Sequence, residues 1–300
     1  MQMSKTPKHT VRPTLACEIS AGRILVARSS DDGKSAQDCG ARDLPAGSIV
    51  PDLMEPNLHD TAAIKQAIQE MLGNISGRGR DVVAILPDAA VRVALLDFDT
   101  LPSHHEEAEA VVRFRLKKSL PFEIEKAKVS YQAQTLGETV RVVAAVALQS
   151  VLEEYETVFR EVGYNPGVVM PSMLAALGAA DAERPTLVVK FDGRTIGIAI
   201  LDKEQLLLFR TLENMHGAAM SGEQLAEEIY PSVVFFQDTY HLNIERICVA
   251  GMPDAAGVAA LQAQTGIEVQ ELVQAGQLVG GANLPVPSSM MAGVLGALIS

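Results

Sequence analysis

The residues with the most obvious chemical potential form one run, His104-His105-Glu106-Glu107, whose imidazoles and carboxylates are metal-ligand types. Ligands on one helix face need a spacing of three or four residues, as in the HExxH motif. These four are adjacent, so they would point in different directions around the first turn of a helix, where carboxylates favour the helix dipole. The run therefore indicates a helix start, and we predict no metal site.

Motifs for nucleophilic catalysis and phosphate binding are missing. Neither Gly-x-Ser-x-Gly nor the complete phosphate loop Gly-x-x-x-x-Gly-Lys-Ser/Thr occurs in the sequence. No catalytic triad or pair of catalytic carboxylates stands out either. The residues alone therefore favour a protein that is not an enzyme.

A concentration of basic residues between positions 113 and 128 stands out in a chain whose net charge is −12. One interpretation is ordinary helix-end charge, because cations stabilise the negative end of the helix dipole. The other is a docking edge for an acidic or carbonyl-rich partner segment, with Leu120-Pro121-Phe122 as its apolar anchor. The basic residues are Arg113, Arg115, Lys117, Lys118, Lys126 and Lys128.

Composition limits the classes of partner. The acidic balance, with a pI near 5.0, argues against direct binding to nucleic acid or anionic lipid. Cys17, Cys39 and Cys248 form no CxxC pair, which favours reduced thiols in the cytoplasm. No apolar segment follows the basic N-terminus, and the apolar run from Met290 to Ile299 is about half a membrane span. We expect a cytoplasmic chain that does not insert into the membrane.

Hydrophobic periodicity predicts alternating strands and helices that would position these residues. Ser103, with Glu106 three residues later, and Ser150 predict helix starts. Pro231 predicts a kink or a break in the long helix that Ser221 opens, and the polar segment 29–47 is typical of a loop. We expect strands near 14–19, 24–28, 48–50, 82–86, 91–98, 128–134, 140–148, 167–170, 186–191, 195–201, 205–211, 244–250 and 267–272. We expect helices near 61–72, 103–119, 150–162, 172–180 and 255–264, a long helix from 221 that includes Phe236, and a last helix from 288.

Both halves of the chain begin with strands and then alternate helix and strand, which predicts a duplicated α/β fold with a cleft between two lobes. A second motif set interrupts the first half and predicts an inserted subdomain. The predicted divisions are a first lobe at 13–95 and 149–182, with the helix at 288–299 packing back on it, an insert at 96–148, a second lobe at 183–287 and a disordered tail at 1–12.

The middle of the chain, residues 82–181, contains distinctive sequence motifs, among them SLPFEIEKAKVSYQ at 119–132. Its order of strands and helices resembles the actin-like proteins of type IV pilus assembly, the PilM family, and their relatives, type II secretion protein L and FtsA. The resemblance implies an actin-like (ribonuclease H-like) duplicated fold, two lobes with a 1C-type insert in the first. It also implies a cytoplasmic scaffold of a pilus or secretion platform at the inner membrane, and it leaves open which of the two machines is served.

The resemblance also implies where a nucleotide would bind. Family members carry Asp-Ile-Gly in the first phosphate turn, where this chain has Glu18-Ile19-Ser20. In the second turn Lys190 stands at the position of the family's Asp, ahead of Asp192-Gly193, and the adenosine stretch keeps one glycine, Gly251, followed by Met252. We therefore expect a degenerate site, a pseudo-ATPase. The alternative is a working actin-like ATPase that hydrolyses ATP with Mg²⁺ and uses Glu18, Ser20, Lys190, Asp192, Gly193 and Gly251.

A peptide partner is implied in the same way. In the PilM family the cytoplasmic N-terminal peptide of a membrane protein, PilN, lies in a groove between lobe 1A and insert 1C. The matching positions here are Arg113, Leu116, Leu120, Pro121 and Phe122. The assembly motor ATPase is a further candidate partner. A polymerising protein of the FtsA kind is disfavoured, because the run 290–299 lacks the basic residues of a membrane-surface helix.

Overall fold

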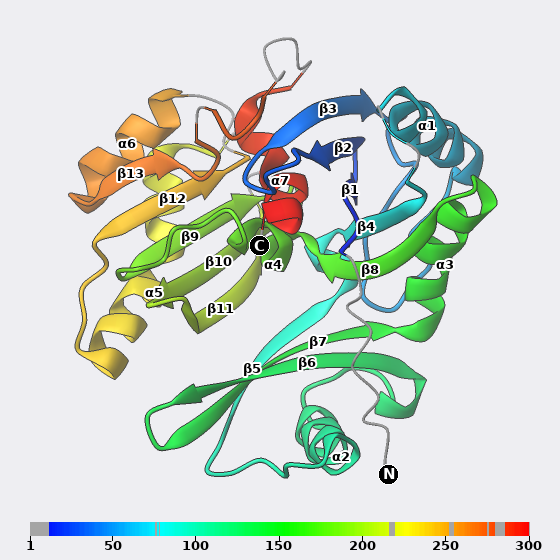
Figure 1. Cartoon of the computed structure of the whole chain (residues 1–300). Helices are drawn as coiled ribbons and strands as arrows, with labels where there is room; N and C mark the ends of the chain where they lie inside the picture. Colours follow the sequence, from blue (N-terminus) through cyan, green and yellow to red (C-terminus); the bar gives the residue numbers. More distant parts are fainter. Residues whose placement is uncertain are drawn as a thin grey trace.

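The computed structural model describes residues 12–75, 77, 79–215, 220–251, 255–274, 276–279 and 286–299. Three β-sheets organise these residues, two of five strands and one of three (Figure 1). The predicted disordered tail lies outside the described residues except for residue 12, and Met252 lies outside them as well.

The first sheet has the strand order β3-β2-β1-β4-β8. Strands β1, β2 and β3 pair antiparallel, and β4 and β8 extend the sheet in parallel from β1. Alternate residues of β1 and β4 face α1 and α3 on one side and α4 and α7 on the other, so both strands are apolar and buried. The elements are β1 Leu15–Ile19, β2 Arg23–Ser29, β3 Ala36–Asp43, α1 Thr61–Asn74, β4 Asp81–Leu86, α3 Gln149–Glu161 and β8 Asn165–Pro171.

The second sheet repeats this plan in the order β11-β10-β9-β12-β13. Again the first three strands are antiparallel and the other two continue in parallel from the central strand, β9. Helices α5 and α6 cover one face (Figure 1). The duplicated fold is therefore confirmed. The elements are β9 Thr186–Phe191, β10 Thr195–Asp202, β11 Gln205–Glu213, α5 Gly222–Tyr240, β12 Arg246–Ala250, α6 Ala255–Thr265 and β13 Glu268–Glu271.

Two short helices lie between the sheets, α4 at Ser172–Leu177 and α7 at Ala292–Ile299, which follows the 3₁₀ turn Ser288–Met291. One apolar cluster joins both helices to strands of both sheets, so the two lobes share a core. Helix α7 also contacts β1 and β2 of the first lobe. Every residue of Ala292–Leu298 is buried, which explains why this helix is apolar all round.

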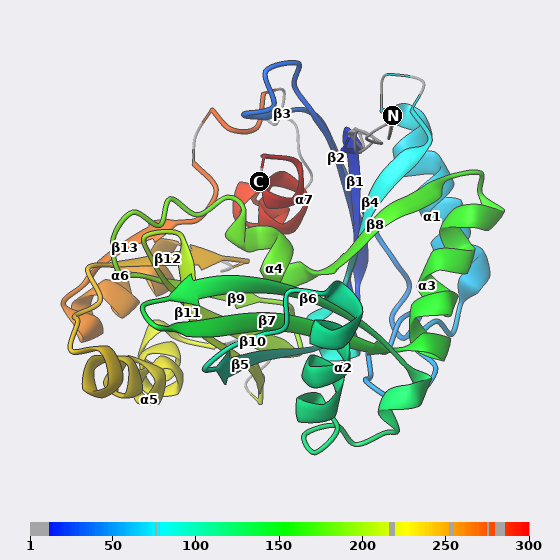
Figure 2. The same ribbon diagram turned by 60° about the horizontal axis from the view of Figure 1, so that its bottom comes forward.

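The insert is an antiparallel sheet with the order β5-β7-β6 and one helix, α2, packed on it (Figure 2). Its sheet begins at Arg92, ahead of the predicted boundary at residue 96, because β5 pairs with β7 along its whole length. The elements are β5 Arg92–Phe98, α2 His105–Leu116, β6 Ala127–Leu136 and β7 Thr139–Leu148, with 3₁₀ turns at Asp88–Ala90 and Ile124–Lys126.

Several local predictions were wrong, each for a physical reason. The polar segment 29–47 contains strand β3, which pairs with β2 at the edge of its sheet and so needs no apolar run. Helix α2 begins at His105, so Ser103 is too early to cap it, and α3 begins at Gln149 because β7 runs into it directly. Helix α1 continues through Gly73 to Asn74.

The predicted break at Pro231 is absent, since α5 is a single helix. Pro231 is exposed, so the carbonyl that loses its helical hydrogen bond lies on the solvent side of the helix. The start of this helix was predicted correctly, because Ser221 and Gln224 form a reciprocal capping box.

Candidate functional site

A cavity of about 270 Å³ lies between the two lobes, beyond the ends of β1, β9 and β12. Loops at the carboxyl ends of central parallel strands are where α/β folds place their binding sites. The cavity brings together all the residues that the resemblance assigned to nucleotide binding. They are Glu18, Ser20, Lys190, Asp192, Gly193 and Gly251.

The charged residues of the cavity pair with each other across the lobes. Lys190 Nζ lies 3.3 Å from Glu18 Oε1, and the two side chains are only 6% and 3% exposed. Ser172 Oγ donates a hydrogen bond to the same oxygen of Glu18. Lys190 therefore neutralises the Glu18 carboxylate.

Two further carboxylates complete a cluster of three acids around one lysine. Burial raises the pKa of Asp88 to about 7 and that of Asp192 to about 6, and the Lys190 charge opposes both shifts. Burial alone would lower the pKa of Lys190, but Glu18, Asp192 and Asp88 raise it overall, so the lysine is protonated. The cluster is therefore short of positive charge at neutral pH.

Hydrogen bonds satisfy only part of this cluster. Asp88 Oδ1 accepts a bond of 2.8 Å from the backbone nitrogen of Met173 at the start of α4. Within the described part of the chain, Asp88 Oδ2 and Glu18 Oε2 have no hydrogen-bond partner. No three His, Cys, Asp or Glu side chains among the described residues are placed to hold a metal ion.

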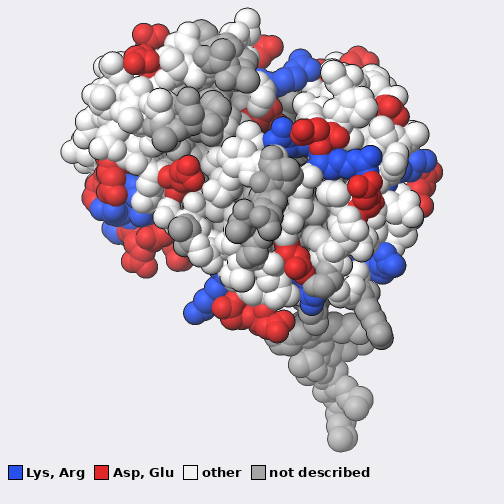
Figure 3. Space-filling model, turned by 90° about the horizontal axis from the view of Figure 1, so that it is seen from above, with Lys and Arg blue, Asp and Glu red and all other residues white. Residues whose placement is uncertain are grey.

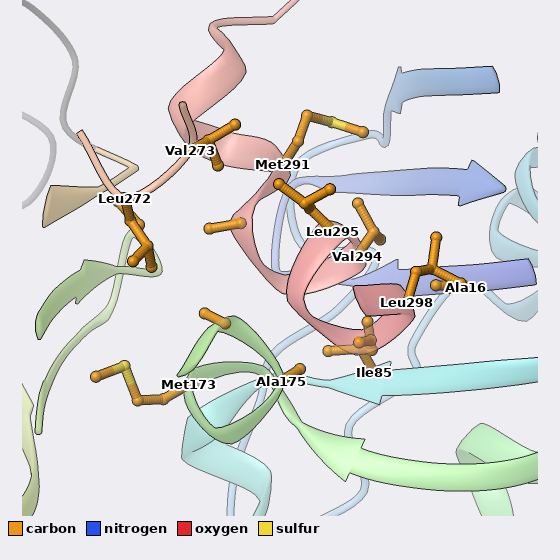
Figure 4. Packing of buried hydrophobic residues seen from close by; sticks show 14 of the residues in the cluster. Ala16, Ile85, Met173, Ala175, Leu272, Val273, Met291, Val294, Leu295 and Leu298 are labelled. Carbon is orange, nitrogen blue, oxygen red and sulfur yellow. The ribbon is translucent and has the colours of Figure 1, made fainter. Parts of the chain in front are cut away.

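The helices beneath the cavity approach it closely because glycines remove side chains at the contacts. A Cβ on Gly293 of α7 would collide with the Glu18 carboxylate, and one on Gly296 would collide with the carbonyl of Ala175 in α4. Figure 4 shows α7 wedged between α4 and the strands of the first lobe, with its apolar side chains among theirs. Gly251 has a φ of +75° and packs on the Phe191 carbonyl, so it also has a structural role.

The positions assigned to the partner peptide lie together on the insert but differ in exposure. Leu116 is fully buried in the insert's own core, and Leu120 and Phe122 pack against that core while Pro121 is exposed. Arg113 Nη2 donates to the backbone oxygens of Ile124 at 2.7 Å and Ala127 at 3.3 Å. Arg113 and Leu116 therefore hold α2 against its own sheet.

Sequence reasoning missed two exposed apolar side chains on α2. Phe114 is 73% exposed and Val111 is 38% exposed. Their signal was available, because they lie three residues apart and off the stripe that Ala108, Val112 and Leu116 form. The His104–Glu107 run is exposed at the start of the same helix, as expected for a helix start.

A polar contact that the sequence did not indicate joins the insert to the second lobe. Arg141 binds both carboxylate oxygens of Asp97 within the insert, at 2.6 and 2.9 Å. Its Nη1 donates to the Leu207 carbonyl and the Tyr240 hydroxyl of the second lobe. The insert is thus covalently continuous with the first lobe, and this guanidinium is one of its polar contacts with the second lobe.

Charge on the outer surface is mixed. On the face seen in Figure 3, Lys and Arg side chains are interspersed with Asp and Glu, and the coloured residues form no continuous basic surface. An extended nucleic acid backbone would find no matching field there. No helix in the described ranges is both long and apolar enough to cross a bilayer.

The fold and the cavity define an α/β protein of the actin-like class. A solved PilM-PilN type IV pilus biogenesis complex matches with a TM-score of 0.77 and 20% identity, over 95% of this chain and 97% of that chain. The cytoplasmic domain of EpsL, an inner membrane component of the Vibrio cholerae type II secretion system, matches with a TM-score of 0.55 and 12% identity, over 95% and 94%.

A Bacteroides thetaiotaomicron protein with an actin-like ATPase fold and unknown function also matches, with a TM-score of 0.51 and 12% identity over 85% of this chain and 88% of that one. No family model matches the sequence, and no curated protein matches it. These likenesses establish the fold. The chain has an actin-like fold and is similar in structure to the PilM-PilN complex.

Proposed function

We propose that this chain is a cytoplasmic scaffold of a type IV pilus or type II secretion platform at the inner membrane. It would bind a short N-terminal peptide of a PilN-like membrane protein and signal to the assembly motor ATPase. The observation that carries the proposal is the whole-chain similarity to the PilM-PilN complex, which covers 95% of this chain and so includes the insert.

The proposal includes a nucleotide cleft that no longer turns ATP over. Lys190 supports this, because a buried cation on Glu18 repels Mg²⁺ and withholds the carboxylate from it. Helix α7 supports it as well, since it packs so closely on Glu18 that a methyl group on Gly293 would collide with the carboxylate. The buried position of α7 also speaks against a membrane-anchored protein of the FtsA kind.

Calorimetric titration with the synthetic N-terminal peptide of the PilN-like protein from the same cell tests the scaffold proposal. We expect a dissociation constant of about ten micromolar or lower. Phe114 is an exposed apolar side chain that the peptide can contact, so Phe114→Ala should weaken peptide binding by about tenfold. Tyr230→Ala is the matched control, because Tyr230 is a similarly exposed aromatic residue on the second lobe. No heat at about 100 micromolar peptide would count against the scaffold.

The alternative function is a working ATPase, which the convergence of the predicted nucleotide residues on one cavity favours. It predicts that ATP with Mg²⁺ raises the melting temperature by several degrees, because a ligand that binds only the folded state stabilises it. Our proposal predicts a shift of less than about 1 °C at millimolar ATP. A larger shift accompanied by phosphate release would replace the pseudo-ATPase with an enzyme.

A further inference from the structure

Strand β6 is the edge of the insert sheet and is long and regular. The order β5-β7-β6 leaves its outer side without a neighbouring strand, and its pairing with β7 runs from Ala127 to Leu136 without a bulge. Edge strands are normally protected by bulges, prolines or short length, because their free amides and carbonyls accept another strand. Neither a bulge nor a proline interrupts β6.

The direction of the free backbone groups follows from two hydrogen bonds. The carbonyl of Ala127 accepts from Arg113 Nη2, and the carbonyl of Thr135 accepts from Gln205 Nε2, so both point away from β7. Because backbone groups alternate along a strand, Val129, Tyr131 and Ala133 also point their N–H and C=O groups outward. No hydrogen bond to these outward groups is seen among the described residues.

Contacts at both ends of the strand limit the free edge. Arg113 covers the Ala127 end, and at the other end Gln134 makes reciprocal hydrogen bonds with the backbone of Leu206 in the second lobe. The stretch that remains, 128–133, has room for an added segment of about five to seven residues.

A polar groove of about 410 Å³ lies between this edge and helix α2. Its cationic side chains are Arg113 and Lys128, and Arg113 is paired with the one acid of the groove, Glu109. Lys128 has no acidic partner among the described residues. The groove is lined by His105, Glu109, Arg113, Ala127, Lys128, Val129, Ser130 and Tyr131.

We propose that an extended acidic segment of a partner protein adds to β6 as a fourth strand of the insert sheet. Its backbone pairs with the outward groups of Val129, Tyr131 and Ala133, and the carboxylates on one face of the added strand meet Lys128. Backbone pairing supplies the affinity, and charge sets the choice of segment. This surface is separate from the cavity between the lobes and from the exposed apolar side chains of α2.

Residue-resolved amide exchange on the full chain tests the proposal, with an alternating Glu-Val hexapeptide as the probe and the corresponding Lys-Val hexapeptide as its charge-reversed control. The amides of Val129, Tyr131 and Ala133 should exchange about tenfold more slowly with the Glu-Val peptide. The amides of Lys128, Ser130 and Gln132 already bond to β7 and should change little. The Lys-Val peptide should protect neither set.

Two pairs of variants separate backbone pairing from charge. Ala133→Pro removes one outward N–H and should lower the affinity for the Glu-Val peptide by about tenfold. Ala133→Ser keeps the N–H and should leave the affinity unchanged. Lys128→Glu should weaken it severalfold, whereas Lys118→Glu, on an exposed residue outside the groove, should not.

Three outcomes would overturn the proposal. One is the absence of Glu-Val binding at about one millimolar. Another is binding without the alternating protection, which would place the peptide elsewhere. The third is protection of the same three amides in the free protein together with dimer formation, which would assign the edge to a second copy of this chain.

Discussion

At the scale of single residues, the buried ion pair of Lys190 and Glu18 is the main electrostatic feature of the cavity. The two side chains come from different lobes and are almost completely removed from water. Breaking such a pair from one side leaves an uncompensated charge in the interior, which costs more than the pair itself contributes. The lysine is therefore a structural tie between the two lobes.

Lys190→Met should destabilise the protein by about 3–5 kcal/mol, because it leaves Glu18 buried without its cation. Urea unfolding measures the change. Lys203→Met, on an exposed turn, is the control and should lie within about 0.5 kcal/mol of the wild type. The double variant Glu18→Gln, Lys190→Met should lose less than the sum of its two single variants. A Lys190→Met variant as stable as the control would contradict the tie.

Asp88 and Asp192 predict the pH dependence of stability. Their folded pKa values, about 7 and about 6, lie above the ordinary value of 3.8. The folded state therefore holds these protons more tightly than the unfolded state. The two groups make their full contribution to the free energy of unfolding below about pH 4, and this contribution is lost as the pH rises towards 7.

Asp88→Asn tests this direction. The variant keeps an oxygen for the Met173 amide but cannot ionise, so its unfolding free energy should fall less than that of the wild type between about pH 5 and about pH 8. Urea unfolding at both pH values gives the comparison, and the difference between the two proteins isolates the contribution of Asp88. Identical pH profiles would show that this carboxyl does not carry the effect.

At the scale of elements, helix α7 joins the lobes by close backbone contact. Gly296 lies so near α4 that a methyl group would meet the Ala175 carbonyl. Gly296→Ala should therefore destabilise the protein by about 1–3 kcal/mol. Gly73→Ala is the matched control, because nothing lies within 4 Å of its added methyl in α1 and alanine favours a helix by up to about 1 kcal/mol. Equal melting temperatures for the two variants would contradict the close packing of α7.

The sequence revealed elements best where their apolar pattern was strong. Helix α3, with its apolar face, and the central strands of the two lobes, such as β4 and β9, were predicted closely, because burial dictates their residue types. Strand β3 was missed because an edge strand can be polar, and the position of α7 under the cavity depends on glycine contacts that no local pattern contains. Burial of Leu116 in the insert core was likewise visible only in three dimensions.

The candidate cavity was predictable only in part. The resemblance named Glu18, Lys190 and their neighbours, and the structure brings them to one place. Asp88 was missed although it follows β4, the strand next to β1, where a carboxyl end is a good position for a site residue. The Ser172–Glu18 hydrogen bond and the Glu18–Lys190 ion pair join residues that are far apart in the sequence. Local sequence patterns therefore do not predict them.

At the scale of the whole molecule, contacts at several distant points fasten the lobes. They include the Glu18–Lys190 pair with the shared core of α4 and α7, the backbone bridge between Ala36 and Leu278, and the Arg141 contact between the insert and the second lobe. An actin-like enzyme needs its lobes to admit and release nucleotide, whereas a scaffold benefits from rigid surfaces. This arrangement favours a molecule that presents its insert to partners.

A crystal structure of the chain with the PilN-like N-terminal peptide, grown in the presence of ATP and Mg²⁺, distinguishes a scaffold from an ATPase. We expect electron density for the peptide on the insert, an intact ion pair between Glu18 and Lys190, and no nucleotide in the cavity. Density for ATP and Mg²⁺ between the lobes, with Lys190 displaced from Glu18 and no peptide on the insert, would contradict this expectation.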